Sequence, residues 1–278
     1  MDLVIRPLSN ATRKRIAQAR SRTGRERGGL FLLEGRRSIE DALGRGVHLT
    51  SIVVNDEIEK WVGEWAGAGR LDPGVEVYRA SEAELAALAD TVAPQGVLAV
   101  GPVPELTLTA LPADPGSLTL IADGVQDPGN LGTLLRTLAA VGGRTALCAR
   151  GTVDPYNPKA LRGAAGATFA IDIAAGMTGR EAAEWCAARG VAVIALSAGE
   201  PDLLQATIPA GPLALAVGNE GAGLSREVVD RSALRAGLPM SGAVESLSAA
   251  VAGSVALYVL ARRPGAGARA PRLRYSDP

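Results

Sequence analysis

Three short segments in the second half of the chain carry residue types from which a ligand site could be built. They span residues 123–136, 213–225 and 239–252. The middle segment is an apolar run that breaks into glycines around a single acid, Glu220. A parallel strand that ends in a glycine-rich turn presents free backbone N–H and C=O groups at the edge of a sheet, where α/β proteins usually bind ligands. The segment therefore predicts a small-molecule pocket built largely of backbone.

Glycine-rich turns after strands also occur in nucleotide-binding enzymes, but the spacing here is wrong for them. Gly124, Gly129 and Gly132 do not form a G-x-G-x-x-G dinucleotide motif, and the sequence contains no G-x-x-x-x-G-K-[ST] phosphate loop. The two cysteines, Cys148 and Cys186, have neither CxxC spacing nor histidine companions, so they support no disulfide framework or metal site. We expect both to be buried thiols and expect no metal.

Taken together, the three segments resemble the motifs of the SpoU/TrmH family of SPOUT methyltransferases, which methylate a ribose 2′-hydroxyl in RNA. Residues 130–136 are similar to the first family motif, 218–225 to the second and 239–248 to the third; 157–162 fit the segment between the first two. The resemblance covers roughly residues 118–262. It implies an α/β domain with a parallel sheet, a deep C-terminal trefoil knot and S-adenosylmethionine as cofactor.

The same resemblance implies a role for individual residues. The backbones of Gly218, Leu238 and Leu247 are expected to contact the cofactor, and the expected catalytic residues are Asn130, Arg136, Glu220, Ser246 and Ser248. Arginine is a poor proton acceptor because its pKa lies above about 12. We therefore expect Arg136 to orient the hydroxyl and adjacent phosphate and to stabilise negative charge. The identity of the proton acceptor stays open among Arg136, Glu220, Ser246 and the substrate phosphate.

One residue departs from the family pattern. The third motif usually reads Ser-Leu-Asn, whereas this chain has Ser246, Leu247 and Ser248. Serine keeps a hydroxyl but loses the reach and the two N–H donors of the amide. This difference leaves open a non-catalytic RNA-binding protein that retains the knotted fold, although the presence of Asn130, Arg136 and Glu220 favours an enzyme.

Charge is unevenly distributed along a chain whose formal net charge is zero. Residues 1–45 contain 11 Lys and Arg against five Asp and Glu, a net charge of +6. A cluster of arginines is typical of a surface that binds phosphates, although a solvated helix face can look the same. The predicted RNA-binding residues are Arg13, Arg15, Arg36, Arg37 and Arg162. This charge disfavours a small-molecule methyltransferase; ribosomal RNA is the expected substrate and transfer RNA the alternative.

The elements that must position these residues fall into two α/β domains. In the first, Ser9 or Asn10 caps a helix to about Arg22, and Gly24–Gly29 form a turn before a strand at 30–33. A helix at 36–43, strands at 49–54 and 96–100 and a capping box at 81–84 follow. In the second, a parallel sheet is expected from apolar runs at 118–122, 145–148, 169–173, 191–196, 213–217 and 234–238. A helix at 247–262 closes the chain.

These patterns predict an RNA-binding domain of ribosomal-protein type at 1–105, a linker at 106–117, a SPOUT domain at 118–263 and a disordered tail at 264–278. No apolar run is long enough to span a bilayer and no signal sequence opens the chain, so we expect a cytoplasmic protein without membrane contact. The resemblance also implies a homodimer whose active sites draw on both subunits. The sole histidine, His48, is expected to have a packing or surface role.

Overall fold

The computed structural model describes residues 3–263 with the exception of 105, 113, 115, 243 and 245. The chain forms two compact units, Met1–Pro104 with Tyr156–Phe169, and Glu105–Pro155 with Ala170–Pro278. We call them the N-terminal unit and the C-terminal unit. Residues 156–169 belong to the N-terminal unit, so each unit is made of two separate stretches of the chain. The predicted domains, in contrast, are continuous stretches. The predicted tail at 264–278 lies outside the described residues.

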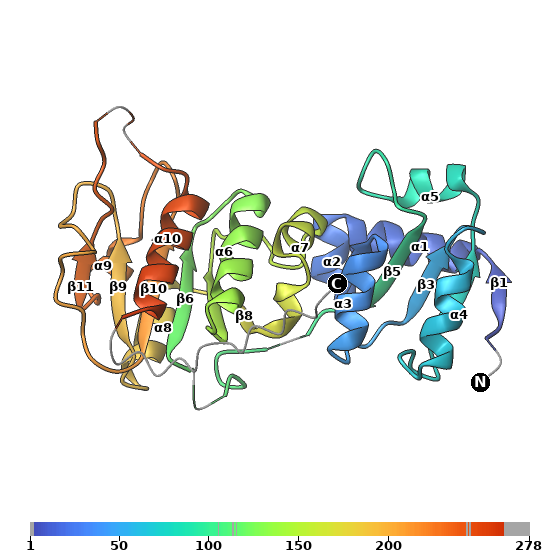
Figure 1. Cartoon of the computed structure of the whole chain (residues 1–278), viewed down its shortest axis with the longest axis horizontal. Coiled ribbons are helices and arrows are strands. Elements are labelled where there is room, and N and C mark those ends of the chain that lie inside the picture. The colour runs from blue at the N-terminus through green and yellow to red at the C-terminus, as the bar shows by residue number, and fades with distance from the viewer. Residues whose placement is uncertain are drawn as a thin grey trace. The chain divides into compact units, whose positions relative to one another are not determined.

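The N-terminal unit is a mixed five-stranded sheet with helices on both faces (Figure 1). Its strands are β1 (Ile5–Pro7), β2 (Leu30–Glu34), β3 (Ser51–Val54), β4 (Glu76–Arg79) and β5 (Val97–Pro102), in the order β1-β4-β3-β5-β2. Its helices are α1 (Asn10–Arg20), α2 (Arg22–Gly28), α3 (Arg36–Gly44), α4 (Glu59–Gly67), α5 (Glu82–Leu88) and α7 (Pro158–Ala164). Strand β5 runs antiparallel to β2 and β3, while β3 and β1 run parallel to β4.

Alternation along the strands divides the core of this unit into two layers. Phe31 and Leu33 of β2 pack with side chains from α3, α4 and α7, whereas Leu32 points to the other face and packs with α1 and α5. Successive side chains of a strand point to opposite faces, so a strand whose two faces are both covered is apolar throughout. This explains the uninterrupted apolar runs at 30–33 and 97–100.

The turn predicted at Gly24–Gly29 is wrong for most of its length, because these residues form helix α2. The Ser21 hydroxyl accepts a hydrogen bond from the Gly24 N–H at 3.1 Å and starts the helix, which ends at Gly29 with a left-handed φ of 58°. A Cβ at Gly24 would lie 2.3 Å from the Gln18 carbonyl oxygen, so glycine permits close packing here instead of a turn. The Ser9 cap and the capping box at Ser81 are confirmed.

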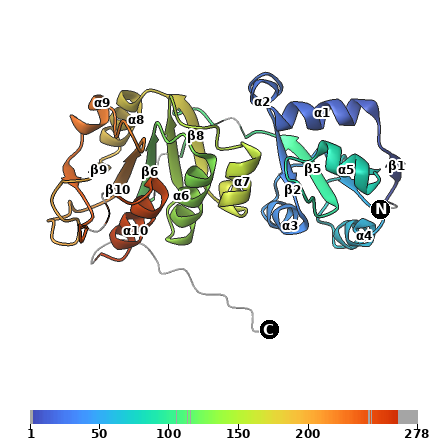
Figure 2. The same ribbon diagram turned by 90° about the horizontal axis from the view of Figure 1, so that it is seen from above.

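The C-terminal unit is a six-stranded sheet in which every neighbouring pair is parallel, as predicted. Its strands are β6 (Leu118–Asp123), β7 (Thr145–Ala149), β8 (Asp172–Met177), β9 (Ala192–Leu196), β10 (Leu213–Gly218) and β11 (Leu234–Ala236). Its helices are α6 (Pro128–Ala140), α8 (Gly179–Ala187), α9 (Arg226–Val229) and α10 (Ala249–Ala261). Figures 1 and 2 show α6 and α10 on one face of the sheet, with α8 and α9 on the other. The strand order is β11-β9-β10-β6-β7-β8.

This strand order brings the predicted motifs together. Gly218, the last residue of β10, is in register with Asp123, the last residue of β6, so the loops that follow both strands leave the same edge of the sheet. Helix α10 packs against α6, and Gly253 is the close contact: a Cβ there would lie 2.4 Å from Leu134 Cδ2. The first and second motifs are therefore neighbours in space although about 90 residues separate them.

Both cysteines are buried in the C-terminal unit, as expected. Burial raises the pKa of the Cys148 thiol and of the Cys186 thiol to about 12, so both stay protonated at neutral pH. His48 is exposed, and its Nδ1 lies 2.7 Å from Asp72 Oδ2. Within the described ranges, the chain has no helix with both the length and the apolar character needed to cross a bilayer.

Candidate functional site

A cavity of about 760 Å³ opens at the sheet edge where β9 and β10 end. Four chain segments and Ala252 line it, and the segments are residues 196–200, 217–223, 238–240 and 246–249. The three residues predicted to contact the cofactor, Gly218, Leu238 and Leu247, all line this cavity. Its size lies within the range of small-molecule sites. We call it the cofactor cavity.

The wall of this cavity at Gly218 has no room for a side chain. A Cβ on Gly218 would lie 2.4 Å from the carbonyl carbon of Gly223 and 2.5 Å from the Leu224 nitrogen. The residues between fold back as a tight loop, in which the N–H groups of Asn219 and Gly223 each donate to the other residue's carbonyl oxygen, at 3.0 and 2.9 Å. Glycine is therefore required at position 218 by close approach of backbone to backbone.

The Asn219 side chain fastens this loop in two directions. Its Oδ1 accepts from the N–H groups of Gly221 and Ala222, both at 2.9 Å, and its Nδ2 donates to the Gly124 carbonyl oxygen at 3.0 Å. The first two bonds hold the loop in its turn, and the third ties it to the loop after β6. Asn219 thus joins the second motif to the first.

A second connection runs between the same two loops at Asp123. This carboxylate is buried, and its Oδ2 accepts a hydrogen bond from the Ser225 N–H at 2.7 Å. Thr152, which follows β7, holds the end of β6 in place, since its hydroxyl donates to the Ala122 carbonyl oxygen at 2.8 Å and accepts from the Gly124 N–H at 2.9 Å. The loops around the cavity are consequently held by side chains rather than by regular secondary structure.

Asn130 and Glu220, both predicted to be catalytic, are in direct contact. Asp127 caps α6 by accepting from the Asn130 N–H at 2.8 Å, which places Asn130 in the first turn of the helix. The Asn130 Nδ2 donates a hydrogen bond to Glu220 Oε1, and Glu220 lines the cavity. The pair therefore presents an oriented carboxylate at the cavity rim.

Arg136 is not part of this cluster. It lies on the exposed side of α6 and forms no hydrogen bond or ion pair with any residue the structure describes, and it does not line the cavity. Six residues separate it from Asn130, and at 3.6 residues per turn this spacing puts the two side chains on different faces of the helix. Within one copy of the chain, the structure does not bring Arg136 together with Asn130 and Glu220.

Ser246 and Ser248 are exposed and line the cavity beside Leu247. The Ser248 hydroxyl is also the N-cap of α10, where it accepts from the Val251 N–H at 3.4 Å. Serine and asparagine are about equally good N-caps. The departure from the family's asparagine therefore preserves the start of α10, although it removes an amide from the cavity.

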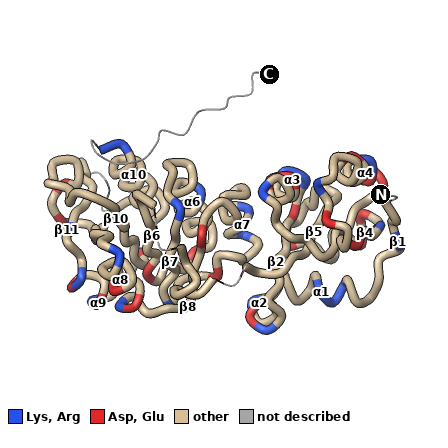
Figure 3. The backbone as a smooth tube through the Cα atoms, turned by 90° about the horizontal axis from the view of Figure 1, so that it is seen from below, with Lys and Arg blue, Asp and Glu red and all other residues tan. Residues whose placement is uncertain are grey.

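Two of the arginines predicted to bind RNA are engaged in ion pairs on α1. Arg13 pairs with Glu84, and Arg15 pairs with Glu76 at 2.8 Å. The pKa of Glu76 is lowered mainly by the hydrogen bond from Arg15. The pKa of Glu84 is lowered first by the hydrogen bond from the Ser81 backbone N–H and second by the one from Arg13. Figure 3 shows the basic positions of this unit interspersed with acidic ones. The two arginines are thus held in place while remaining about one third exposed.

Arg162, on α7, lies against a buried carboxylate of the same unit. Its guanidinium contacts Asp90 at 2.9 Å and Glu34 at 3.9 Å, and the Glu34 side chain is only 4% exposed. Glu34 also accepts from the backbone of Asp90 and from the N–H and hydroxyl of Thr91. Arg162 therefore has a structural partner, while Arg37 is exposed and forms no ion pair with a described residue.

Sequence reasoning missed several residues that shape the cavity. Asp123 and Asn219 lie inside the segments 123–136 and 213–225, but neither was predicted to have a role. The position of Asp123, an acid at the end of an apolar run, could have indicated that it is buried and bonded. Residues 196–200 carried no recognisable motif. Among the residues with described positions, no group of three or more His, Cys, Asp or Glu side chains could hold a metal ion. The arrangement offers backbone groups, hydroxyls and the carboxylates of Glu200 and Glu220, which suit binding and positioning of a substrate.

Comparison with known proteins agrees with this geometry. The model of the SpoU rRNA Methylase family matches residues 117–258, and the model of an MRM3-like substrate binding domain matches residues 10–99. The chain is 35% identical over 232 residues to the 23S rRNA (guanosine(2553)-2′-O)-methyltransferase RlmP of Bacillus subtilis, covering 83% of this chain and 88% of that protein.

Two solved structures with bound AdoMet share the fold. One is an rRNA methyltransferase from Sinorhizobium meliloti, 28% identical with a TM-score of 0.81, covering 93% of this chain and 97% of that one. The other is the SpoU methyltransferase AviRb from Streptomyces viridochromogenes, 27% identical with a TM-score of 0.79, covering 91% and 98%. The similarity therefore extends through both units.

The tight wall at Gly218 yields a direct prediction. A Gly218→Ala substitution is expected to weaken S-adenosylmethionine binding at least roughly 10-fold, because the added methyl displaces the Gly223 backbone and such overpacking costs about 1–3 kcal/mol. Isothermal titration calorimetry measures the change. Gly221→Ala adds the same methyl to the same loop, where its nearest neighbour lies at 3.5 Å, and is expected to change the affinity much less. Equal affinities for the two variants would contradict the assignment.

Proposed function

Because the chain belongs to the SpoU rRNA methylase family, we propose that it transfers a methyl group from S-adenosylmethionine to a ribose 2′-hydroxyl of ribosomal RNA. One observation carries the proposal: the loops of the second and third motifs line a single cavity, with the Asn130–Glu220 pair at its rim. No observation favours transfer RNA or a non-catalytic protein over this activity. Ribosomal RNA as substrate is consistent with an enzyme of the cytoplasm.

The residues of the cavity fit the cofactor. S-adenosylmethionine supplies an electrophilic methyl group on a sulfonium, so the protein needs to bind it and to position the attacking oxygen. Backbone groups around Gly218, Leu238 and Leu247 would hold it, and the two leucines offer apolar surface for the adenine. We further propose that a trefoil knot joins these loops, since segments from 196 to 249 come from separate elements and surround one cavity.

Glu220 and Arg136 have different roles toward the substrate. The Asn130 amide holds the Glu220 carboxylate at the rim, from which it can orient the 2′-hydroxyl or accept its proton. The Arg136 guanidinium contributes electrostatic stabilisation of the developing alkoxide and of the adjacent phosphate. Ser246 and Ser248 add hydroxyl groups to the lining of the cavity.

Arg136 does not reach the Asn130–Glu220 pair of its own chain, but it can take part in the reaction if two copies of the chain share a site. Helix α10 exposes Val251, Val255 and Tyr258, which lie one turn apart on a single face and are 48%, 42% and 55% exposed. An apolar stripe of this kind is typical of a contact with another chain. We propose a homodimer through α10, in which Arg136 of the partner subunit completes the site next to α6.

The role of Arg136 can be tested on the reaction. Arg136→Ala is expected to reduce methyl transfer to unmodified ribosomal RNA roughly 100-fold or more, because it removes a positioned charge, while cofactor affinity stays unchanged. Label transfer from methyl-labelled S-adenosylmethionine, followed by nucleoside analysis for 2′-O-methylation, measures both product and rate. Arg144→Ala removes an exposed arginine just beyond α6 and should retain activity. An active Arg136 variant would remove this residue from the mechanism.

The dimer has its own test. Val255→Glu is expected to convert the protein to a monomer in sedimentation velocity, because an unpaired carboxylate would be buried at the interface. The monomer should lose methyl transfer yet retain S-adenosylmethionine binding. Leu204→Glu places the same charge on another exposed apolar residue and should leave the assembly intact. A fully active monomeric Val255 variant is incompatible with a shared site.

A further inference from the structure

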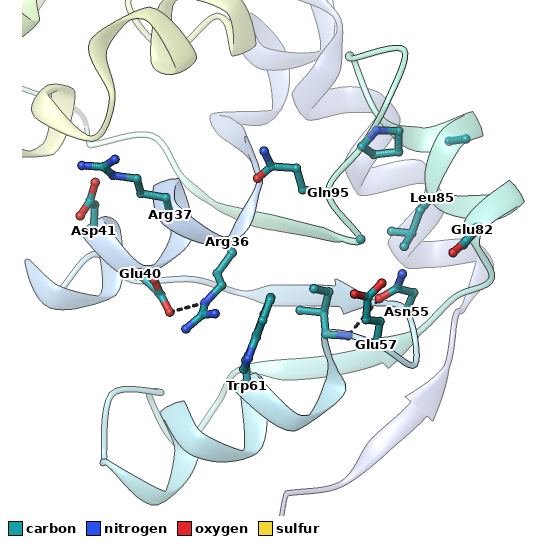
Figure 4. Close-up of a pocket in the computed structure, with 14 residues that line it drawn as sticks. Arg36, Arg37, Glu40, Asp41, Asn55, Glu57, Trp61, Glu82, Leu85 and Gln95 are labelled. Carbon is teal, nitrogen blue, oxygen red and sulfur yellow. Dashed lines mark hydrogen bonds and ion pairs between the residues drawn. The ribbon is translucent and has the colours of Figure 1, made fainter.

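A second cavity, of about 950 Å³, opens in the N-terminal unit and shares no residue with the cofactor cavity. It lies between α3, the turn after β3, α4, α5 and the loop before β5 (Figure 4). Its volume falls in the upper part of the range for ligand pockets. We call it the α3–α4 cavity.

One wall of this cavity is a fixed cationic plane. The Arg36 guanidinium lies 3.7 Å from the centroid of the Trp61 ring, and its Nε donates to Glu40 Oε1 at 2.7 Å. Glu40 is held in turn by the Trp65 Nε1, at 3.3 Å. The stacked and hydrogen-bonded guanidinium is therefore prevented from swinging, yet its side chain is still 38% exposed. Planes of this kind are used to stack unpaired RNA bases.

The turn after β3 adds an oriented side-chain amide. Asn55 is 8% exposed, and its Oδ1 accepts from the Ile58 N–H at 3.1 Å, which fixes the orientation of the amide. Asn55 lines the cavity, and its Nδ2 forms no hydrogen bond with a described residue. This donor can therefore bond to an acceptor on a ligand without first giving up a partner within the protein.

Glu57, two residues further along, provides a complementary acceptor. Its carboxylate is exposed, lines the same cavity and forms no ion pair with any described residue. Asn55 and Glu57 therefore offer one donor and one acceptor side by side on a single turn (Figure 4). Guanine carries a carbonyl acceptor next to N–H donors on its pairing edge, whereas adenine lacks this carbonyl.

We propose that the α3–α4 cavity binds an unpaired guanine nucleotide of the RNA substrate. The base stacks on Arg36, its carbonyl oxygen accepts from the Asn55 amide, and its N–H groups donate to Glu57. Arg37, exposed beside the cavity, contacts the phosphate. This inference rests on the proposed function, since it requires an RNA substrate, and it adds a base-specific site to the N-terminal unit.

The competing occupant is a cationic protein segment, because Asp41 and Glu82 also line the cavity. Two observations favour the base. The charge of Glu40 is compensated by Arg36, whose own positive charge would repel a cation, and lysine and arginine side chains have no acceptor for the Asn55 donor.

The test uses the full-length protein and short uridine-rich RNAs that differ only in one central base, guanine, inosine or adenine. Fluorescence anisotropy at fixed salt is expected to give roughly 10-fold tighter binding for guanine than for adenine, with inosine between them because it lacks the exocyclic amine. Glu57→Gln should reduce the preference for guanine to about twofold or less. Glu64→Gln, the same charge change at an exposed position of α4 outside the cavity, should keep the preference.

Each outcome decides between the possibilities. Equal binding of all three RNAs by a protein that still methylates ribosomal RNA would overturn the guanine site and leave the proposed function intact. If the unaltered protein shows neither RNA binding nor methyl transfer, the guanine site and the proposed function are both overturned. Tighter binding of an oligolysine peptide than of any RNA, abolished by Glu57→Gln, would assign the cavity to a protein partner and reject the proposal.

Discussion

The three hydrogen bonds of the Asn219 side chain are the constraint on which the functional site depends. The loop from Gly218 to Gly223 has no regular structure, and its backbone approaches itself too closely for a side chain at Gly218. Without the Asn219 side chain the N–H groups of Gly221 and Ala222 would lose the acceptor that orients them, and the loop would lose its link to the Gly124 carbonyl. A site that binds through backbone needs this preorganisation, because backbone groups cannot change rotamer to find a ligand.

Buried and partly buried polar side chains have different roles in the two units. In the C-terminal unit, buried or partly buried side chains such as Asp123 and Thr152 bond to backbone and shape loops for binding. In the N-terminal unit, Glu34 is buried with Arg162, Asp90 and Thr91 around it, and these contacts hold residues 156–169 to the first part of the chain. Arginines that form one basic cluster in the sequence thus differ in structure: Arg162 forms ion pairs, whereas Arg37 is exposed and forms none with a described residue.

Sequence patterns predicted the parallel sheet, the buried cysteines and the helix caps because these follow from local chemistry and periodicity. The positions of Gly218, Leu238 and Leu247 around one cavity rested on a family resemblance, since spacing alone could not place three distant segments together. Helix α2 was missed because Gly24 reads as a turn residue until its contact with Gln18 is known. The α3–α4 cavity was equally invisible, because the stacking of Arg36 on Trp61 and the free Asn55 amide are properties of tertiary packing.

The central claim is that a backbone cradle held by Asn219 binds the cofactor. The most direct measurement is the S-adenosylmethionine affinity of an Asn219→Ala variant by calorimetry, together with its thermal unfolding to establish that the variant is folded. The variant loses three hydrogen bonds of about 1 kcal/mol each, so the account predicts a folded protein whose affinity falls at least about 10-fold. A folded Asn219 variant with the affinity of the unaltered protein would contradict it.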